Sequence, residues 1–166
     1  FFSFHPYKPI ASSDGGMIST NDKDISEYVE SYRNFGRQNT SKGYEIVGSG
    51  FKFYMNNLNA TIALTQLEVY NEKLEQRKES FNKLKSLGLK GRLIEHDLHS
   101  SYYIATLVAE DKKTAQLYRD KYVNSRLYPP LHKQPYYIDE DIEILKNTEN
   151  IYPKLVNLPL YNPKYY

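Results

Sequence analysis

The sequence predicts a mixed α/β chain in two parts, with a long helix between them. Three observations favour this fold class. Short apolar segments alternate with a helical pattern in the first part, an uninterrupted helical pattern follows over residues 58–87, and strand and helix patterns return from residue 102. The composition, 40% hydrophobic and 25% charged, is that of a globular protein, so these patterns can be interpreted as packed elements.

The first part opens with two short apolar segments. Residues 1–4 are an aromatic run interrupted by one serine, which indicates a buried strand. The Asp-Gly-Gly sequence at 14–16 predicts a turn, because glycine adopts backbone conformations that other residues avoid. Residues 17–20 then predict a second short strand.

A helix follows, with Asn21 or Asp22 as its N-cap and Gly36 as its C-terminal stop. Its apolar side chains recur at helical spacing. Residues 37–49 are polar and contain two glycines, so we expect a loop there.

The longest predicted element is the helix over 58–87. Asn56 or Asn57 would cap it, and Gly88 would end it. Leucine and phenylalanine mark one face, and charged residues mark the other. A helix of this length would extend about 45 Å, which is long enough to connect two domains.

The second part predicts a small α+β unit. The double proline at 129–130 ends a strand there, because proline cannot donate a hydrogen bond to a sheet. The expected strands are 102–108, 126–128 and 158–161, and the expected helices are 112–122 and 141–147.

Composition and charge argue against several classes of protein. A net charge of +2 is too small to indicate binding to nucleic acid or to an anionic membrane. With no cysteine, disulfides and thiolate metal sites are impossible, and we expect no metal site. No apolar run approaches the roughly 20 residues of a membrane helix, and no signal-peptide pattern opens the chain. We therefore expect a cytoplasmic protein.

The segment Ser3-Phe4-His5-Pro6-Tyr7-Lys8 places a lysine just after the first strand and before the Asp-Gly-Gly turn. A lysine amine can form an imine with a carbonyl compound and can then transfer a proton. Taken alone, such a lysine is most often a surface residue, and a single histidine is most often structural. The rest of the chain must decide between these interpretations.

Four further motifs follow the lysine segment in a fixed order. They are Tyr32-Arg33-Asn34-Phe35-Gly36, residues 50–67 beginning Gly50-Phe51-Lys52-Phe53-Tyr54-Met55, Tyr128-Pro129-Pro130-Leu131-His132, and Leu158-Pro159-Leu160-Tyr161. With the lysine segment, this order resembles the DegT/StrS-type sugar aminotransferases, enzymes that use pyridoxal 5'-phosphate (PLP). The resemblance covers nearly the whole chain.

The resemblance implies a fold and an assembly. The chain would be the C-terminal half of a fold-type I PLP-transferase. Residues 1–72 would be the C-terminal portion of the large PLP-binding domain, and residues 73–166 the small α+β C-terminal domain. The long helix would link them. A homodimer with composite active sites is also implied.

The resemblance also assigns roles near the lysine. Lys8 would be the Schiff-base lysine and the proton shuttle. Ser3, five residues earlier, would donate its hydroxyl to the PLP phosphate, and His5 would support the site. Lys52 stands where the family has an asparagine that reaches the partner subunit's PLP phosphate. It is either a variant phosphate ligand or a solvated loop lysine.

Two C-terminal residues match family positions near the substrate. These are Tyr128 and His132, which could equally be a packed strand residue and a turn residue. The chain departs from the family pattern at Tyr7 and Pro9, which flank the lysine, and at Tyr54, which replaces an arginine.

The resemblance implies transfer of an amino group, with glutamate as donor, to a nucleotide-linked keto-deoxyhexose. Such reactions belong to cell-surface polysaccharide or amino-sugar biosynthesis. A family branch that runs a dehydration replaces the lysine by histidine, so Lys8 favours transamination.

Both ends of the sequence are abrupt, and residue 1 falls inside an expected strand. In the family, the aspartate that pairs with the pyridine nitrogen, the aromatic residue stacked on the ring and the phosphate-binding loop all precede the lysine. We therefore expect a fragment that alone binds PLP poorly and turns over no substrate. Two alternatives stay open: a non-catalytic remnant that keeps the dimer-forming helices, and an interaction module built on the helix at 58–87.

Overall fold

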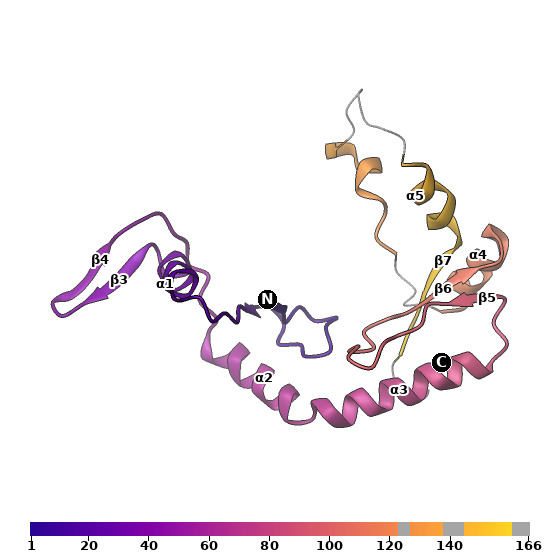
Figure 1. The fold of residues 1–166 in the computed structure, drawn as a ribbon, viewed down its shortest axis with the longest axis horizontal. Coiled ribbons are helices and arrows are strands. Elements are labelled where there is room, and N and C mark those ends of the chain that lie inside the picture. The colour runs from indigo at the N-terminus through magenta and orange to yellow at the C-terminus, as the bar shows by residue number, and fades with distance from the viewer. Residues whose placement is uncertain (123–126, 138–144, 161–166) are drawn as a thin grey trace. The chain divides into compact units, whose positions relative to one another are not determined.

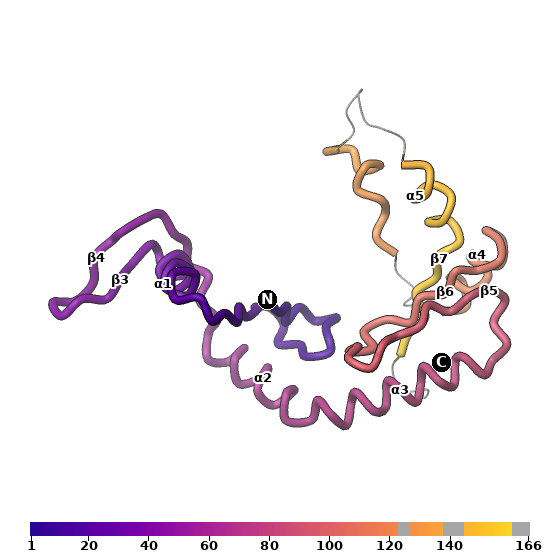
Figure 2. Tube along the Cα trace, in the orientation of Figure 1, coloured from indigo at the N-terminus to yellow at the C-terminus, as the bar shows by residue number. Residues whose placement is uncertain are grey.

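The computed structural model describes residues 1–122, 127–137 and 145–160 (Figures 1 and 2). The chain forms two compact units, Phe1–Tyr70 and Asn71–Tyr166, hereafter unit 1 and unit 2. Across the described ranges, no helix has the length and apolar character needed to cross a membrane. Each unit is described by itself.

Unit 1 begins with a minimal antiparallel pair of strands. Strand β1 (Phe2–Ser3) pairs with β2 (Gly16–Met17), so the predicted second strand starts one residue earlier and is shorter. Helix α1 (Lys23–Tyr32) follows. Asp22 is its N-cap, and its carboxylate accepts hydrogen bonds from the backbone N–H groups of Asp24 and Ile25 at 2.9 and 3.1 Å.

The predicted loop at 37–49 is wrong, because most of it is a β-hairpin. Strand β3 (Arg37–Thr40) pairs antiparallel with β4 (Gly43–Ile46). Two residues connect the strands, and Gly43 has a φ of 129°, a conformation that glycine adopts without strain. The two strands are mostly polar, so they lack the alternation of apolar and polar residues that predicts a strand.

The predicted continuous helix is also corrected. Helix α2 (Asn57–Glu68) belongs to unit 1, and α3 (Tyr70–Ser86) continues into unit 2. Val69 separates them, with φ −100° and ψ 10°, outside helical geometry. Its β-branched side chain is a slightly poor helix former. Asn56, one of the two predicted caps, accepts a hydrogen bond from the Asn59 N–H at 2.9 Å.

Unit 2 contains a three-stranded antiparallel sheet in the order β5-β6-β7. The strands are β5 (Gly91–Leu93), which the sequence analysis missed, β6 (Ala105–Ala109) and β7 (Leu155–Leu158). The last two correspond to the predicted strands at 102–108 and 158–161. Strand β6 starts three residues later and ends one residue later than predicted, whereas β7 lies three residues earlier, and residue 161 lies outside the described residues.

The predicted helix at 112–122 is α4 (Lys112–Lys121). Its N-cap, Asp111, accepts a hydrogen bond from the Thr114 N–H at 2.7 Å, and this bond lowers the pKa of the Asp111 carboxyl. Helix α5 (Lys146–Ile151) begins later than the predicted helix at 141–147, of which residues 141–144 lie outside the described residues.

Three short 3₁₀ turns, η1 (Leu131–Lys133), η2 (Pro135–Tyr137) and η3 (Tyr152–Lys154), complete the described elements of unit 2. The predicted strand at 126–128 is wrong for residues 127 and 128, which are irregular, and residue 126 lies outside the described residues.

The apolar core of unit 2 lies between its sheet and its helices. Alternate residues of β6 and β7 are buried, as expected when one face of a sheet is covered. Helix α3 contributes Phe81 and α4 contributes Ala115. The buried cluster comprises Phe81, Ala105, Leu107, Ala109, Ala115, Val156, Leu158 and Leu160.

Candidate active site

Lys8 lies on a loop that leaves β1 and returns to β2. The loop is closed where the Ser12 N–H donates to the Phe4 carbonyl at 2.9 Å, and the Phe4 N–H donates to the Gly15 carbonyl at 3.0 Å. Figure 2 traces this loop near the N-terminus of the chain. Lys8 is half-buried at its midpoint. The strand pair and the loop closure therefore give the lysine a defined backbone position.

A proline turn sets the local course of the chain at the lysine. The Lys8 N–H donates to the His5 carbonyl at 2.8 Å, with Pro6 at the second position of the turn. Proline favours this position because its φ is already fixed near the required value. Gly16, at the other end of the loop, faces the Phe2 carbonyl, and a Cβ there would lie 2.7 Å from that oxygen.

His5 lies on the same turn as Lys8, and Ser3 lies at the end of β1, two residues before that turn. The Ser3 hydroxyl oxygen accepts a long hydrogen bond, 3.4 Å, from the His5 N–H. Its own O–H stays available as a donor. The His5 Nδ1 accepts from the Tyr7 N–H at 3.4 Å, so a neutral His5 ring carries its proton on Nε2. Ser3 and His5 are exposed, so a ligand can reach both.

These three residues fit part of a PLP site. The observation that supports the fit is the exposed Ser3 hydroxyl with an unused donor, at the end of the strand that leads into the turn carrying Lys8. An amine can bind an aldehyde covalently, and a hydroxyl can donate to a phosphate oxygen. The segment from the end of β1 to Lys8 can thus offer one covalent attachment and one phosphate contact.

Lys52 lies on a segment that crosses the end of α1. Its backbone forms an isolated antiparallel bridge with Asn34, and its ammonium lies 5.6 Å from the centre of the Tyr54 ring. The same segment reaches the lysine loop through Met55, because a Cβ on Gly15 would be 3.3 Å from the Met55 sulfur. The structure therefore connects this segment with the loop by packing, while Lys52 itself is exposed.

Glycines allow this crossing, a role that the sequence analysis did not assign to them. A Cβ on Gly36 would lie 1.8 Å from the Gly48 carbonyl oxygen, and a Cβ on Gly50 would lie 2.1 Å from the Gly36 nitrogen. The Phe51 N–H donates to the Tyr32 carbonyl at 2.8 Å. Gly36 and Gly50 each belong to a motif of the resemblance. A glycine kept within such a motif was the signal that could have indicated a close backbone approach.

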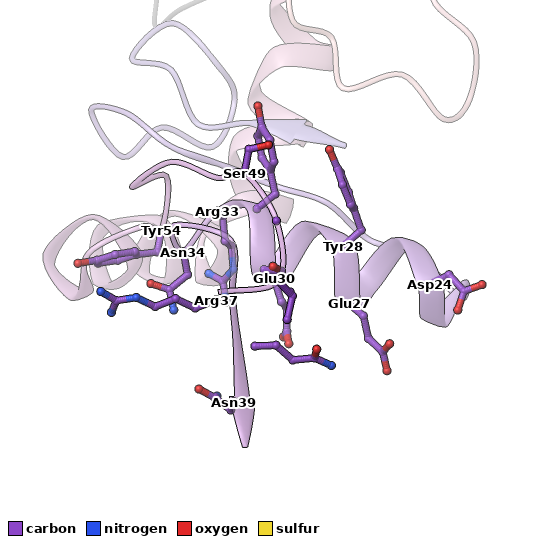
Figure 3. Close-up of a pocket in the computed structure, with 15 residues that line it drawn as sticks. Asp24, Glu27, Tyr28, Glu30, Arg33, Asn34, Arg37, Asn39, Ser49 and Tyr54 are labelled. Atoms are coloured by element: carbon purple, nitrogen blue, oxygen red, sulfur yellow. The ribbon is translucent and has the colours of Figure 1, made fainter. Parts of the chain in front are cut away.

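A groove of about 1010 Å³ runs along α1 and the base of the β3–β4 hairpin (Figure 3). The Arg37 guanidinium lies over two rings, 5.0 Å from Phe35 and 4.2 Å from Tyr44. Arg33 also lines the groove. The acidic residues Asp24, Glu27 and Glu30 line it as well, so its charge is mixed. The six predicted site residues do not line this groove, and the groove was not predicted from the sequence.

The predicted substrate residues lie in unit 2. Tyr128 is 83% exposed. His132 lies on η1, where its Nε2 is 2.7 Å from a Glu149 carboxylate oxygen and its side chain is only 13% exposed. Lys133 donates to the other Glu149 oxygen. Hydrogen bonds from Lys133 and then His132 lower the pKa of the Glu149 carboxyl. His132 thus has a structural partner in α5, and its substrate role stays a prediction.

Known proteins resemble this chain along almost its whole length. The family model described as the DegT/DnrJ/EryC1/StrS aminotransferase family matches residues 1–163. The spore coat polysaccharide biosynthesis protein SpsC of Bacillus subtilis is 25% identical over 186 residues. That match covers 96% of this chain and 48% of SpsC. The chain therefore spans about half the length of the curated relatives it matches.

Solved structures show the same fold. Helicobacter pylori PseC, an aminotransferase involved in the biosynthesis of pseudoaminic acid, superposes with a TM-score of 0.79 at 22% identity, over 95% of this chain and 46% of PseC. The aminotransferase TlmJ of Streptoalloteichus hindustanus gives 0.80 at 21% identity, over 98% of this chain and 47% of TlmJ. These matches confirm the predicted mixed α/β fold of the aminotransferase type.

Proposed function

This chain belongs to the DegT/DnrJ/EryC1/StrS aminotransferase family, and we propose that it carries the cofactor lysine of a PLP-dependent sugar aminotransferase. The observation that carries the proposal is the closed loop that holds Lys8, with His5 on the same turn and Ser3 at the end of the strand that precedes it. PLP is the cofactor of this family. The similarity to SpsC, a spore coat polysaccharide biosynthesis protein, supports a sugar substrate.

In the proposed reaction, glutamate donates the amino group and a nucleotide-linked keto-deoxyhexose accepts it. When bound, PLP supplies the electron sink that stabilises a carbanion on the reacting carbon. Lys8 would hold the cofactor through Nζ and, once released, would move a proton between the substrate carbon and the C4' carbon of the cofactor. Ser3 would donate to the phosphate, and His5 would support this turn.

The proposal extends to groups outside the lysine loop. Lys52 would bind the phosphate of the partner subunit's cofactor in a homodimer, and Tyr128 and His132 would contact the substrate. Residues 1–72 would be part of the large cofactor-binding domain, and residues 73–166 would be the small domain. The division of the structure at residue 70 supports a boundary in this region. The expected location is the cytoplasm.

The test is covalent capture of PLP. The chain is incubated with PLP, and borohydride then reduces the C=N bond, formed with loss of water, to a stable secondary amine that mass mapping can locate. We expect a substoichiometric adduct concentrated on Lys8, because only part of the site has been assigned to these residues. Uniform labelling of Lys8 and the exposed Lys42 would contradict the proposed function.

Two controls sharpen this test. Lys8→Arg keeps the charge and should abolish the selective adduct. Ser3→Ala should reduce the advantage of PLP over pyridoxal, which lacks the phosphate, because the assigned phosphate donor is gone. A Ser3→Ala variant that still prefers PLP to the same extent would remove Ser3 from the site while leaving Lys8 in it.

A further inference from the structure

Ser12 is buried in a unit that buries little else. In unit 1, all of which the structure describes, two side chains are excluded from solvent, those of Ser12 at 0% and Ala63 at 8% exposure. The neighbouring Ser13 is exposed. Burying a hydroxyl is unfavourable unless it is hydrogen-bonded, so a fully buried serine in an otherwise open unit calls for a specific contact.

That contact lies where the lysine loop (residues 4–15) closes, at the backbone bonds between Phe4, Ser12 and Gly15, hereafter called the neck of the loop. The Ser12 hydroxyl donates to the Asp14 carbonyl at 2.8 Å. It thereby spans Ser13, which has a φ of 71°, a conformation that is uncommon for residues other than glycine. The hydroxyl thus fixes the turn that separates the two residues bonded to Phe4, namely Ser12 itself and Gly15.

The neck controls the position of Lys8. The lysine lies four residues after Phe4 and four residues before Ser12, the pair whose backbone bond closes the loop. A shift of either neck residue moves the whole loop. Covalent and proton-transfer chemistry is sensitive to displacements of about 1 Å, so a rigid neck matters for the amine.

We propose that the Ser12 hydroxyl is a positioning group for Lys8, acting through its bond across the turn to the Asp14 carbonyl. The importance of this role rests on the proposed function of Lys8. Ser12 itself contacts neither cofactor nor substrate in this proposal. Its hydroxyl holds Ser13 in its unusual conformation and keeps the loop closed at a fixed geometry.

The first test measures the lysine amine without any cofactor. Competitive acetylation with acetic anhydride, followed across pH and mapped by mass spectrometry, gives the reactivity of Lys8 relative to Lys42. We expect Ser12→Ala to change this ratio by about fivefold, the factor that corresponds to one typical hydrogen bond. Ser13→Ala, the same change at the exposed neighbour, should leave the ratio and its pH profile unchanged. Equal profiles in the two variants would overturn the proposal.

Two further measurements separate positioning from general stability. Amide hydrogen exchange in Ser12→Ala should accelerate within residues 4–16 while α1 keeps its wild-type protection. Faster exchange in α1 as well would assign Ser12 to the stability of the whole unit and reject a positioning role. Ser12→Thr keeps the hydroxyl and should restore the acetylation ratio, whereas a Thr variant as impaired as the Ala variant would count against the hydroxyl.

PLP capture then connects the inference with the reaction. Ser12→Ala should lower the selectivity of the reduced adduct for Lys8 over Lys42, and Ser13→Ala should not. If the wild-type chain shows no such selectivity, the proposed function fails, while the acetylation ratio still decides the role of Ser12. If wild type is selective and Ser12→Ala is equally selective, the proposed function stands and the positioning role is overturned.

Discussion

The two units of this chain are stabilised in different ways. Among its described residues, unit 2 buries a cluster of eight between a sheet and its helices. Unit 1 leaves large apolar side chains such as Phe53 and Leu58 exposed, at 66% and 78%, and its described contacts are backbone hydrogen bonds, close glycine approaches and contacts between aromatic rings. The structure of unit 1, which carries Lys8, therefore depends more on backbone geometry, and the structure of unit 2 depends more on the burial of apolar side chains. Substitutions should affect the two units through different mechanisms.

The largest expected effect comes from the core of unit 2. Leu107 in β6 is 0% exposed, and Leu107→Ala should lower the free energy of unfolding of unit 2 by about 2–5 kcal/mol through lost transfer energy and a cavity. Hydrogen exchange resolved for β6 and for α1 measures each unit separately. Leu117→Ala in α4, where the leucine is 62% exposed, is the control and should change little. A similar small loss in both variants would refute burial as the basis of unit 2.

The corresponding change in unit 1 is Gly36→Ala. A Cβ there would overlap the Gly48 carbonyl oxygen, and the φ of 71° disfavours alanine, so we expect a loss of about 2–3 kcal/mol. The measurement is amide exchange at the end of α1 and over residues 50–53. Gly48→Ala serves as the control, because a Cβ at Gly48 would meet no atom within 4 Å. Equal effects of the two changes would show that the crossing needs no close approach.

A polar contact of unit 2 sharpens the comparison. The Arg119 guanidinium donates to the carbonyls of Tyr152, Pro153 and Leu155, at 2.7–3.3 Å, and so connects α4 with the start of β7. Arg119→Lys cannot reproduce this fork and should lower the unfolding free energy by about 1–2 kcal/mol. Denaturant unfolding measures this change in the unfolding free energy. Arg92→Lys on the exposed part of β5 should be neutral, and a neutral Arg119→Lys would leave burial as the sole basis of unit 2.

The sequence predicted best where one local signal acts alone. The caps at Asp22 and Asn56 illustrate this, because a short polar side chain before a helix has a local role that needs no distant partner. The β3–β4 hairpin and strand β5 were missed, since their pairing depends on partners rather than on apolar alternation.

The candidate site shows the same division. Ser3, His5 and Lys8 were predicted from a contiguous motif, which runs from the end of β1 into the turn at residues 5–8, and their roles stay predictions. Buried Ser12 was missed, because its role depends on contacts with Phe4 and Asp14 that only the folded loop creates. The partner of His132 was missed for the same reason. Glu149 lies 17 residues away and reaches the histidine through the fold of unit 2.

The smallest expected effect is a pH dependence in unit 2. Hydrogen bonds from Lys133 and His132 hold the pKa of the Glu149 carboxyl below its ordinary value of 4.5. A carboxyl with a lowered folded-state pKa adds stability above its unfolded pKa and loses it as the pH falls through the folded value. The contact between η1 and α5 should therefore weaken below about pH 4.5. In Glu149→Gln the part of the acid-side loss that Glu149 contributes should disappear, as measured by the unfolding midpoint from pH 3 to 7, whereas Glu110→Gln should keep the wild-type pH dependence of stability. If the loss of stability at low pH is unchanged in Glu149→Gln, the contacts of Glu149 with Lys133 and His132 add no pH-dependent stability to unit 2, which is then stabilised by its apolar core.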